Sequence, residues 1–366
     1  CCHKIFVITR QWKPEQPLTE NFGNISVYRY TANDCSSLSY ISDTVKNTRK
    51  LFEKLTQSLQ FDIINFHQPL ASIGITTSHR SHNLTKVYTF HSPWHKEYAI
   101  KTESSKSPFR PLQILIRRIV ERAVIKKCSS AIVLSQYMAN QLKETHNNTN
   151  IHIEMCPGGA DIKRFKPSQN REQLRAEITL PKNRIVLLTV RGLTPRTGIE
   201  NLIRAMQLVV KKNVNVSLII GGGGVLKNKL LALTKELNLE NNIKFLGFIN
   251  DDDLVTYYQV ADYFILPTKY LEGFGLVTPE ALASGLPVLA TPVGGTIEIL
   301  TQLNKDLLFK STEPQDIAAL ILKYATLPKN EWQALSQKCH TFINNTYTWQ
   351  MSAQKTEKHF LQLNNQ

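Results

Sequence analysis

The sequence predicts an α/β protein with two domains, each built around a parallel β-sheet. Its 366 residues suffice for two domains of ordinary size. Short apolar runs alternate with helix-like segments along most of the chain, which is the pattern of a parallel sheet covered by helices on both faces. Glycine clusters follow the expected strands of the second half. The hydrophobic content of 42% and charged content of 20% are those of a globular protein.

The first half supplies five expected strands and one long expected helix. The expected strands are the continuous apolar run at residues 5–8 and the strand-like segments 25–30, 61–67, 86–91 and 131–135. Residues 38–60 place Leu51, Phe52, Leu55 and Leu59 at helical spacing, so a helix is expected there.

The second half repeats the rhythm and predicts a ligand site. Its expected strands are residues 185–190, 216–220, 243–248, 263–268 and 288–291, with helical patterns between them. In open parallel sheets, ligands bind at the carboxyl ends of the strands. Glycines cluster at those ends: Gly192, Gly198, Gly221 to Gly224, Gly273, Gly275, Gly294 and Gly295. A turn explains any one cluster, but not five at one edge.

The stretch 270–285, YLEGFGLVTPEALASG, concentrates the chemistry. Glu272 and Glu280 flank a loop with two glycines, and a short helix follows, with Thr278 expected as N-cap, Pro279 as first helical residue and Gly285 as the C′ stop. Unpaired amides before a helix hold phosphate oxygens, and carboxylates accept hydrogen bonds from sugar hydroxyls. The alternative is that Glu280 only complements the helix dipole while Glu272 is a solvated loop acid.

The charge is strongly positive and unevenly distributed. The chain carries +15, and residues 1–150 hold 20 Lys/Arg against 10 Asp/Glu. Such a half suits a phosphorylated ligand, an anionic membrane surface or nucleic acid. No basic motif interleaved with aromatics is present, so nucleic acid is ranked last and is not expected as a partner.

Cysteine usage and hydropathy indicate a cytoplasmic protein. The six cysteines are scattered, without a C-x2-C pair, so a reduced setting without structural zinc is expected. No apolar run reaches the roughly 18 residues of a membrane span. No secretory signal pattern opens the sequence.

Residues 112–127 form an expected basic amphipathic helix. Its apolar stripe runs through Leu112, Leu115, Ile116, Ile119, Val120, Ala123 and Val124, with Arg117, Arg118, Arg122 and Lys126 off the stripe. Such a helix can lie on anionic lipid. An ordinary surface helix with its stripe on the core is the favoured interpretation.

Two motifs carry a resemblance to a known family. The E-x7-E loop at 272–280 resembles the donor-site signature of the retaining glycosyltransferases with the GT-B fold, the glycogen-synthase-like and α-mannosyltransferase-like members of family 4 (group 1). CPGGADIKRFKP (156–167) resembles the segment that opens their second domain. The resemblance implies two Rossmann-like domains facing each other across a cleft: an acceptor-side domain (1–153) and a nucleotide-sugar-binding domain (154–346). Residues 347–366 would form a last helix that crosses back to the first domain.

The resemblance also implies roles for individual residues. Glu272 would lie close to the transferred sugar and Glu280 would hold the ribose hydroxyls of the nucleotide. The backbone amides of 274–277 (Phe274, Gly275, Leu276, Val277), after Gly273, would meet the hexose and its phosphates. His91, at the end of the strand 86–91, matches a histidine that contacts the donor near the reacting centre, and is preferred to His95.

The diphosphate clamp departs from the family pattern. In VRGLTPRTG (190–198), Gly192 stands where an arginine is expected and Thr197 where a lysine is expected. Arg196, with Arg191 or Lys227, could supply the cations instead. Losing a charge-assisted hydrogen bond costs about 1.5–3 kcal/mol, or roughly tenfold to a hundredfold in rate if the bond acts only in the transition state.

The beginning of the chain also departs from the family. Its first strand resembles the family's second, so the first strand, its glycine loop and the first helix are expected to be missing from the first domain. The first residue is Cys rather than Met, which fits truncation. A divergent first strand is the alternative.

The leading functional hypothesis is a retaining hexosyltransferase that moves a hexose from a nucleotide-sugar to a hydroxyl of a saccharide or lipid-linked acceptor. No metal or other cofactor is expected, because Asp251 to Asp253 fit helix N-capping better than metal binding. The expected location is the cytoplasm. The inner face of the membrane, with peripheral contact through helix 112–127, is the alternative that the basic helix leaves open. The alternatives are a nucleotide-sugar-binding protein with weak or no transferase activity, or an epimerase or phosphorylase of the same fold.

Overall fold

The computed structural model describes residues 3–103, 105–146, 150–178, 184–212 and 214–364. The chain divides into two compact units. Unit 1 comprises residues 1–133, 139–154 and 357–366, and unit 2 comprises residues 134–138 and 155–356. The expected boundary at 153/154 falls close to this division, and the C-terminal segment expected at 347–366 is shared between the units.

Unit 1 contains two sheets. The first has the order β1-β3-β2, in which β1 and β3 are parallel and β2 is antiparallel to β3. The second has the order β4-β5-β6-β7, and its β4–β5 and β5–β6 pairs are parallel. The strands are β1 (Ile5–Arg10), β2 (Thr19–Phe22), β3 (Ile25–Tyr30), β4 (Ile63–Phe66), β5 (Thr85–Phe90), β6 (Ser130–Val133) and β7 (His152–Met155). The expected strands of the first half are confirmed, and β2 and β7 are two strands that the sequence pattern did not predict.

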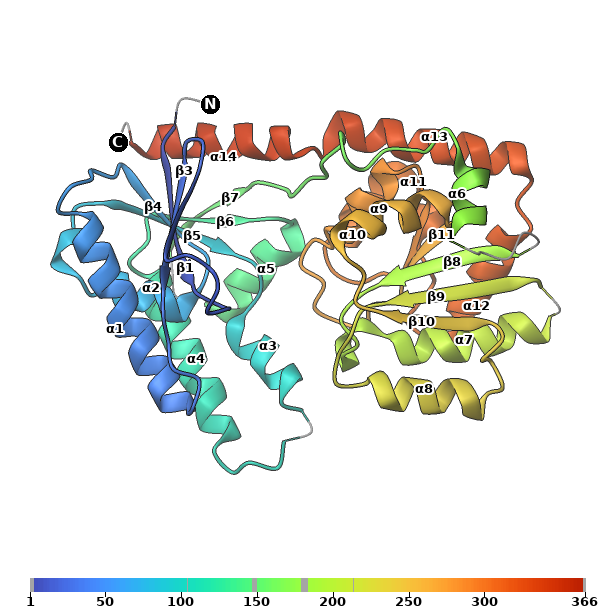
Figure 1. Cartoon of the computed structure of the whole chain (residues 1–366), viewed down its shortest axis with the longest axis horizontal. Coiled ribbons are helices and arrows are strands. Elements are labelled where there is room, and N and C mark those ends of the chain that lie inside the picture. Colours follow the sequence, from blue (N-terminus) through green and yellow to red (C-terminus); the bar gives the residue numbers. More distant parts are fainter. Residues whose placement is uncertain (1–2, 104, 147–149, 179–183, 213, 365–366) are drawn as a thin grey trace. The chain divides into compact units, whose positions relative to one another are not determined.

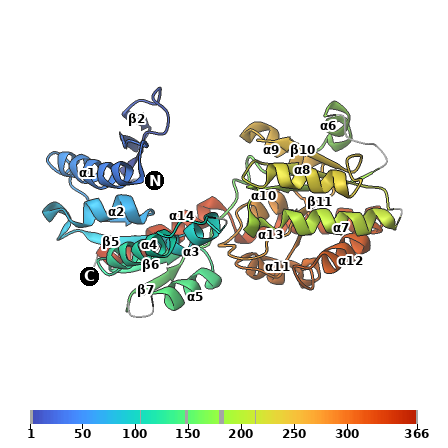
Figure 2. The same cartoon turned by 90° about the horizontal axis from the view of Figure 1, so that it is seen from below.

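The helices that accompany these sheets begin at recognisable signals. They are α1 (Ser37–Leu55), α2 (Pro69–Thr76), α3 (Trp94–Lys101), α4 (Arg110–Ile125) and α5 (Gln136–Thr145), with a 3-10 turn at His79–Ser81. Ser36 caps α1 by accepting from the backbone N–H of Ser39 in a reciprocal capping box. Helix α1 lies beside α2 (Figure 2), and its residues Phe52 and Leu55 are buried.

Unit 2 is built on a five-stranded parallel sheet in the order β10-β9-β8-β11-β12 (Figure 1). The strands are β8 (Ile185–Val190), β9 (Val216–Gly221), β10 (Ile243–Gly247), β11 (Tyr263–Leu266) and β12 (Val288–Ala290). The helices are α6 (Arg171–Glu177), α7 (Ile199–Lys211), α8 (Lys227–Glu236), α9 (Asp251–Val260), α10 (Val277–Ala283), α11 (Thr296–Asn304), α12 (Pro314–Ala325) and α13 (Lys329–Thr346), with 3-10 turns at Pro195–Thr197 and Lys305–Leu307. The last helix, α14 (Trp349–Asn364), begins in unit 2 and continues into unit 1 from Glu357. The strand order reverses between β8 and β11, which is a topological switch point.

The core of unit 2 explains why its strands read as continuous apolar runs. Helices cover both faces of the sheet (Figure 1), so side chains of both orientations along β8 and β11 are buried. On α7, Leu202, Ile203, Met206 and Val209 are fully buried, and this face contacts α12 and α8. This spacing is that of an amphipathic helix with one face on the core.

Two expected helix starts are wrong in detail. Helix α10 begins at Val277, because the chain already turns at Gly275, whose carbonyl accepts from the Thr278 N–H at 2.7 Å. Thr278 is therefore inside the helix rather than its N-cap. Gly285 does end the helix, with φ +73°. Asn250, not the aspartates after it, caps α9 by accepting from the backbone N–H of Asp253.

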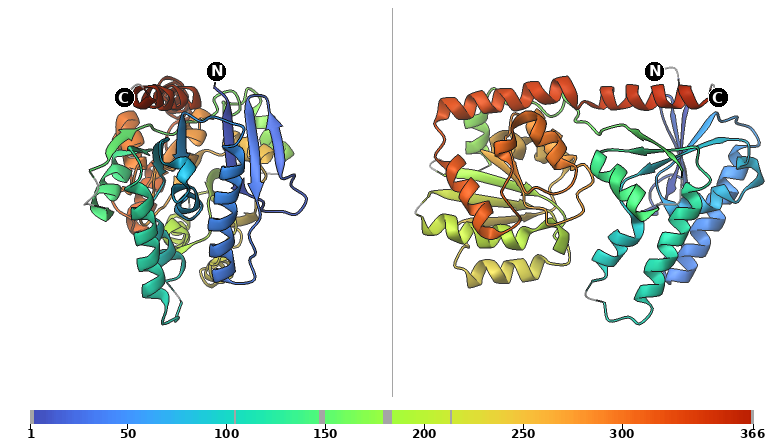
Figure 3. Two further views of the ribbon diagram at one scale, coloured as in Figure 1. Left: turned by 90° about the vertical axis from the view of Figure 1, so that its left-hand side faces the viewer. Right: turned by 180° about the vertical axis from the view of Figure 1, so that it is seen from behind.

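The apolar stripe of α4 (teal in Figure 3) does not face the core over its first half, contrary to the favoured interpretation. Leu112, Leu115, Ile116 and Ile119 are 54%, 50%, 45% and 56% exposed, whereas Val124 is fully buried. The helix contacts α2 and α3, which cover only part of its length. The first half of α4 therefore presents an exposed apolar face with arginines beside it.

The described helices include none that combines the length and apolarity of a membrane crossing. The four described cysteines, Cys35, Cys128, Cys156 and Cys339, are free thiols. Cys1 and Cys2 lie outside the described residues.

Candidate functional site

Two segments of unit 2 meet where neighbouring strands end. Arg191 follows β8, while Thr268 and Glu272 follow β11, its neighbour in the sheet. Parallel strands end at the same edge, so residues that are far apart in sequence come together there. The sequence predicted a site at this edge, and the described contacts place several of its candidate residues there.

Glu272 is held in a buried ion pair. The Arg191 Nη2–H donates to Glu272 Oε2 at 2.5 Å, and both side chains are 8% exposed. Thr268 joins them: its hydroxyl donates to the same carboxylate oxygen at 2.9 Å and accepts from Arg191 Nη1 at 2.5 Å. The bonds to the carboxylate are charge-assisted and fix its orientation. The interpretation of Glu272 as a solvated loop acid is therefore wrong.

The backbone around Glu272 is constrained on both sides. Leu271 adopts φ +58°, unusual for a residue with a side chain, and its carbonyl accepts from Arg196 Nη1 at 2.9 Å. Gly294 has φ +69°, and a Cβ there would lie 2.0 Å from the Glu272 carbonyl oxygen. The Gly295 N–H donates to that same carbonyl at 3.0 Å. The glycine pair after β12 therefore packs against the backbone of Glu272 and helps to fix its position.

The loop after Glu272 offers a row of backbone donors. Within the described residues, the amides of Phe274, Gly275, Leu276 and Val277 donate to no protein acceptor. Phe274 is buried and packs edge-on against Tyr347, which anchors the loop. Consecutive amides of this kind suit the oxygens of an anionic ligand.

Glu280 lies on α10 in a partly buried setting. Its Oε2 accepts from the hydroxyl of Tyr258 at 3.2 Å. Burial raises the pKa of Glu280, while the Tyr258 hydrogen bond and the nearby Arg164 oppose that rise. A carboxylate with one protein donor keeps lone pairs for other hydroxyl groups. This favours a binding role over simple complementation of the helix dipole.

The clamp segment offers little free positive charge. Gly192 is exposed and contributes no side chain, and the Thr197 hydroxyl is used inside the turn, where it donates to the Gly192 and Thr194 carbonyls. Arg191 and Arg196 are engaged with Glu272 and Leu271. Of the three proposed cations, Lys227 is exposed at the start of α8 and has no partner among the described residues.

His91 belongs to unit 1, where a hydrogen-bonded chain fixes its tautomer. Thr89 donates to Asn65 Oδ1 at 2.9 Å, so Asn65 Nδ2 is the atom that donates to His67 Nε2 at 3.1 Å. The proton of neutral His67 then resides on Nδ1, which donates to His91 Nε2 at 3.0 Å. His91 therefore carries its own proton on Nδ1, which makes that atom a hydrogen-bond donor.

Both rings of this pair are neutral at pH 7. They stack with centroids 5.3 Å apart, and each keeps an exposed edge. Partial burial first, and the His91 ring second, lower the pKa of His67 to about 4. Partial burial also lowers the pKa of His91 below its usual 6.5.

His95 has different surroundings. It lies on α3, half-buried, with its ring 6.4 Å from that of His146. Burial is the main cause that lowers the pKa of His95 to about 4. The buried carboxylate of Glu121 fixes the start of α3 by accepting from the Trp94 N–H. These contacts favour a structural role for His95, which keeps the prediction on His91.

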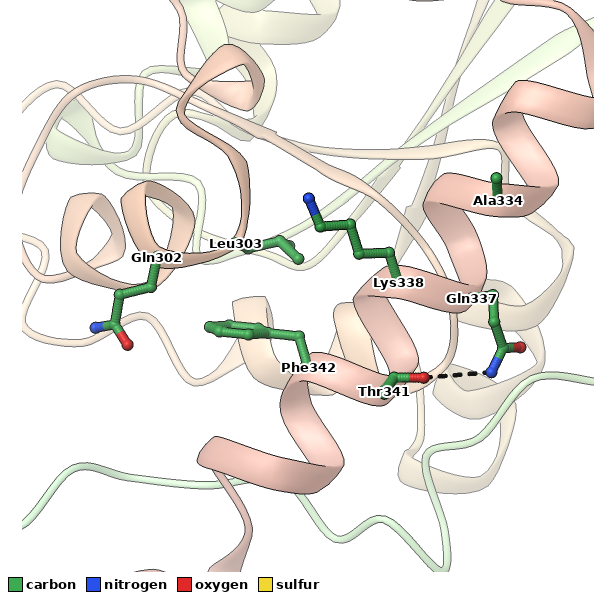
Figure 4. A pocket seen from close by; sticks show the side chains of 7 residues that line it. All are labelled: Gln302, Leu303, Ala334, Gln337, Lys338, Thr341 and Phe342. Carbon is green, nitrogen blue, oxygen red and sulfur yellow. Dashed lines mark hydrogen bonds between the residues drawn. The ribbon is translucent and has the colours of Figure 1, made fainter.

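A surface depression of about 450 Å³ lies between α11 and α13 (Figure 4). Leu303, Lys338 and Phe342 are among its lining residues, and Gln337 donates to Thr341 at its rim. None of the predicted site residues lines it. We therefore do not place the donor there.

The sequence did not reveal the residues that form hydrogen bonds to the predicted site residues. Thr268, Tyr258 and His67 support Glu272, Glu280 and His91. His67 had a signal, since it ends the run 61–67 as His91 ends the run 86–91. Tyr258 had no such signal, because a tyrosine within a helical pattern is normally interpreted as a core residue.

Glu298 and Ser135 were missed as well. The Glu298 carboxylate accepts from the backbone N–H groups of Gln136 and Tyr137, and Ser135 donates to the Gly273 carbonyl at 2.6 Å. All of these residues group with unit 2. The start of α5 therefore belongs to the surroundings of the 272–280 loop.

Comparison with known proteins gives two family matches. The model described as "Glycosyl transferases group 1" matches residues 170–349, and "Glycosyltransferase Family 4" matches residues 2–164. A D-inositol 3-phosphate glycosyltransferase from Corynebacterium jeikeium is 30% identical over 248 residues, 61% of this chain and 59% of that protein. The chain thus spans about six-tenths of that relative's length.

Two solved structures show the same fold. The sucrose-phosphate synthase of Thermosynechococcus elongatus gives a TM-score of 0.83 at 22% identity, covering 98% of this chain and 89% of the other. Anabaena HepE, solved with UDP-glucose, gives 0.71 at 20% identity, covering 91% and 85%. With the two family models matching residues 2–164 and 170–349, this two-domain α/β protein belongs to the group 1 glycosyltransferases of the GT-B fold.

Proposed function

We propose that the chain is a retaining hexosyltransferase that takes its sugar from a nucleotide-sugar donor. The observation that carries the proposal is the anchored carboxylate of Glu272, held by Arg191 and Thr268 next to four loop amides that donate to no acceptor in the described part of the chain. A fixed acceptor beside fixed donors suits a ligand with sugar hydroxyls and a diphosphate. The related HepE was solved with UDP-glucose, which supports this donor class.

Each candidate has a role in this proposal. Glu272 binds the transferred hexose, the amides of 274–277 bind the sugar and diphosphate, and Glu280 holds the ribose hydroxyls. His91, with its proton on Nδ1, donates a hydrogen bond to the donor sugar. Loop amides and cations, rather than a metal ion, stabilise the leaving diphosphate.

The acceptor in this proposal is a hydroxyl of a saccharide or of a lipid-linked saccharide. The exposed apolar face of α4 supports the lipid-linked class, because Leu115 and Ile119 lie on a helix that also exposes Arg118 and Lys126. Such a face binds anionic lipid by apolar burial and charge together. The protein would then work at the cytoplasmic face of a membrane.

A second candidate is a nucleotide-sugar-binding protein with weak or no transferase activity. The observation that favours it is the clamp: Gly192 has no side chain, Thr197 is used internally, and Arg191 and Arg196 already have partners. That arrangement would bind a donor without fully stabilising its departing diphosphate.

A thermal-shift panel tests the binding common to both candidates. UDP, GDP, ADP and their sugar conjugates are added separately, and a ligand that binds only the native state raises the unfolding midpoint. We expect one nucleotide series to act, with the shift lost in Glu280→Ala. The matched control is Glu236→Ala, which removes an exposed carboxylate of the same unit, at the end of α8 and outside the proposed ribose site. No shift from any nucleotide in the folded chain would reject both candidates.

A transfer assay with the nucleotide-sugar so identified then separates the candidates. Turnover that Glu272→Gln abolishes, with donor binding retained, supports the transferase. Binding without turnover over a range of saccharide acceptors supports the binding protein.

A further inference from the structure

Two histidines and a glutamate of unit 1 come together outside the proposed transferase site. His152 and Glu154 lie two residues apart on β7, so their side chains project from the same face of the strand. His359 comes from the last turns of α14 (Figure 1). One ligand-type atom from each residue lies within 4.8 Å of the others.

The spacing is close to that of a metal site. Zinc bonds of about 2.1 Å in a tetrahedral site place ligand atoms about 3.4 Å apart. His152 Nε2 and Glu154 Oε2 are 3.5 Å apart, so this pair already has the required separation. The side chains of His152 and Glu154 are 63% and 38% exposed, which leaves them free to rotate and shorten the longer separations.

The third residue is already oriented by a supporting group. His359 is buried, and its Nε2 lies 2.7 Å from the hydroxyl of Ser130 at the start of β6. When the Nε2–H donates to this hydroxyl, the lone pair lies on Nδ1, the nitrogen left to bind an ion. Metal-binding histidines almost always use their second nitrogen in a hydrogen bond of this kind.

A simple surface ion pair explains less of the arrangement. An exposed His–Glu pair is worth little and needs no third member. Here a buried histidine from a distant part of the sequence lies beside the pair, with the His152 and His359 rings 5.7 Å apart and tilted by 30°. Two imidazoles and one carboxylate form a ligand set that suits zinc and its neighbours in the first transition row.

We propose that His152, Glu154 and His359 bind a divalent transition-metal ion, with zinc as the best match, and that the ion fastens the end of α14 to β7. The role is structural, since none of the proposed catalytic or donor-binding residues belongs to the group. The expectation that structural zinc is absent came from cysteine spacing, which carries no information on a His/Glu site.

Metal titration of the chelator-stripped chain tests the proposal, after alkylation of accessible thiols. Saturating zinc, at about a hundredfold excess over its dissociation constant, should raise the unfolding midpoint by about 5 °C. Cobalt in place of zinc should give the visible absorption of a site with nitrogen and oxygen ligands. His152→Gln and Glu154→Gln alter exposed side chains, so both should fold, keep the metal-free midpoint and lose both signals.

The matched control is the double variant His79→Gln/His82→Gln, which removes another histidine pair of unit 1, with rings 5.1 Å apart. It should keep the full zinc response. Zinc shifts of equal size in wild type, His152→Gln and Glu154→Gln would overturn the proposal. The absence of any shift in the wild type would overturn it as well.

Discussion

Replacing Arg191 with glutamine should destabilise unit 2 strongly, because it leaves the buried Glu272 carboxylate without its cation. Removing one partner of a buried ion pair costs about 3–5 kcal/mol. Both side chains are 8% exposed and Thr268 still donates to Glu272, so we expect the lower end, about 3 kcal/mol. Glu272→Gln should lower the free energy of unfolding by a similar amount, since it leaves the buried Arg191 guanidinium without its carboxylate partner.

The free energy of unfolding of the double variant tests whether Arg191 and Glu272 stabilise the protein as a pair. If the two side chains act as a pair, Arg191→Gln/Glu272→Gln should cost about 4 kcal/mol rather than the sum of the single changes, a coupling of about 2 kcal/mol. Urea denaturation followed by circular dichroism and tryptophan fluorescence measures all three variants. Trp332, whose indole N–H donates to the Asp262 carbonyl, is a reporter inside the same unit.

An exposed pair of the same unit provides the control. Arg204 and Glu200 lie at i and i−4 on α7 and are 46% and 26% exposed. Arg204→Gln should cost less than about 0.5 kcal/mol. Additive effects of Arg191→Gln and Glu272→Gln, within about 0.5 kcal/mol, would refute the claim that Arg191 is the partner that holds Glu272.

Three further predictions address the clamp, the histidine pair and the apolar helix face. A Cβ at Gly192 would have only the Gly223 carbonyl oxygen near it, at 4.0 Å, so Gly192→Arg should fold and raise turnover roughly tenfold or more by supplying the missing cation. Gly222→Ala is the contrasting change, because its Cβ would lie 1.9 Å from a carbonyl oxygen and should destabilise the chain; unchanged turnover in a folded Gly192→Arg protein would contradict the clamp interpretation. The folded-state pKa of His67 is about 4, below its unfolded value near 6.5, so the folded state binds fewer protons and stability should fall as pH drops from 6.5 towards 4. Urea midpoints at several pH values measure that loss, and His67→Asn should reduce the slope without abolishing it, because burial also lowers the pKa of His95 to about 4; a slope that the variant leaves unchanged would assign the loss to the other groups. Ile119→Glu should reduce co-sedimentation with anionic vesicles without changing the urea midpoint, and equal sedimentation of variant and wild type would exclude this face as the lipid contact.

The sequence predicted the sheet of unit 2 well because β8, β9, β11 and β12 are buried on both faces. Runs such as 185–190 and 263–268 are almost entirely apolar, which is typical of strands in a parallel sheet covered on both faces. The glycines after these runs also located the site edge, since strand ends of a parallel sheet gather at one side. Both inferences depend on local pattern alone.

Contacts between residues that are far apart in the chain could not be predicted from the sequence. Arg191 was considered only as a diphosphate cation, and nothing in VRGLTPRTG indicates that its guanidinium binds Glu272, because that contact depends on how β8 and β11 are paired. The exposed face of α4 was missed for a related reason. Periodicity reveals that a helix has an apolar stripe, but not whether another element covers it.

The division of the chain has a consequence for how the protein is made. Unit 1 includes residues 357–366, in which Glu357 bonds to His3 and His359 to Ser130, yet about 200 residues of unit 2 are synthesised before them. At translation rates of about 5–20 residues per second, unit 1 waits about 10–40 s for its last segment. During that interval the surface that later receives the end of α14 stays open on the nascent chain, while unit 2 is still being completed. Unit 1, although it begins first, is therefore the last of the two to be finished.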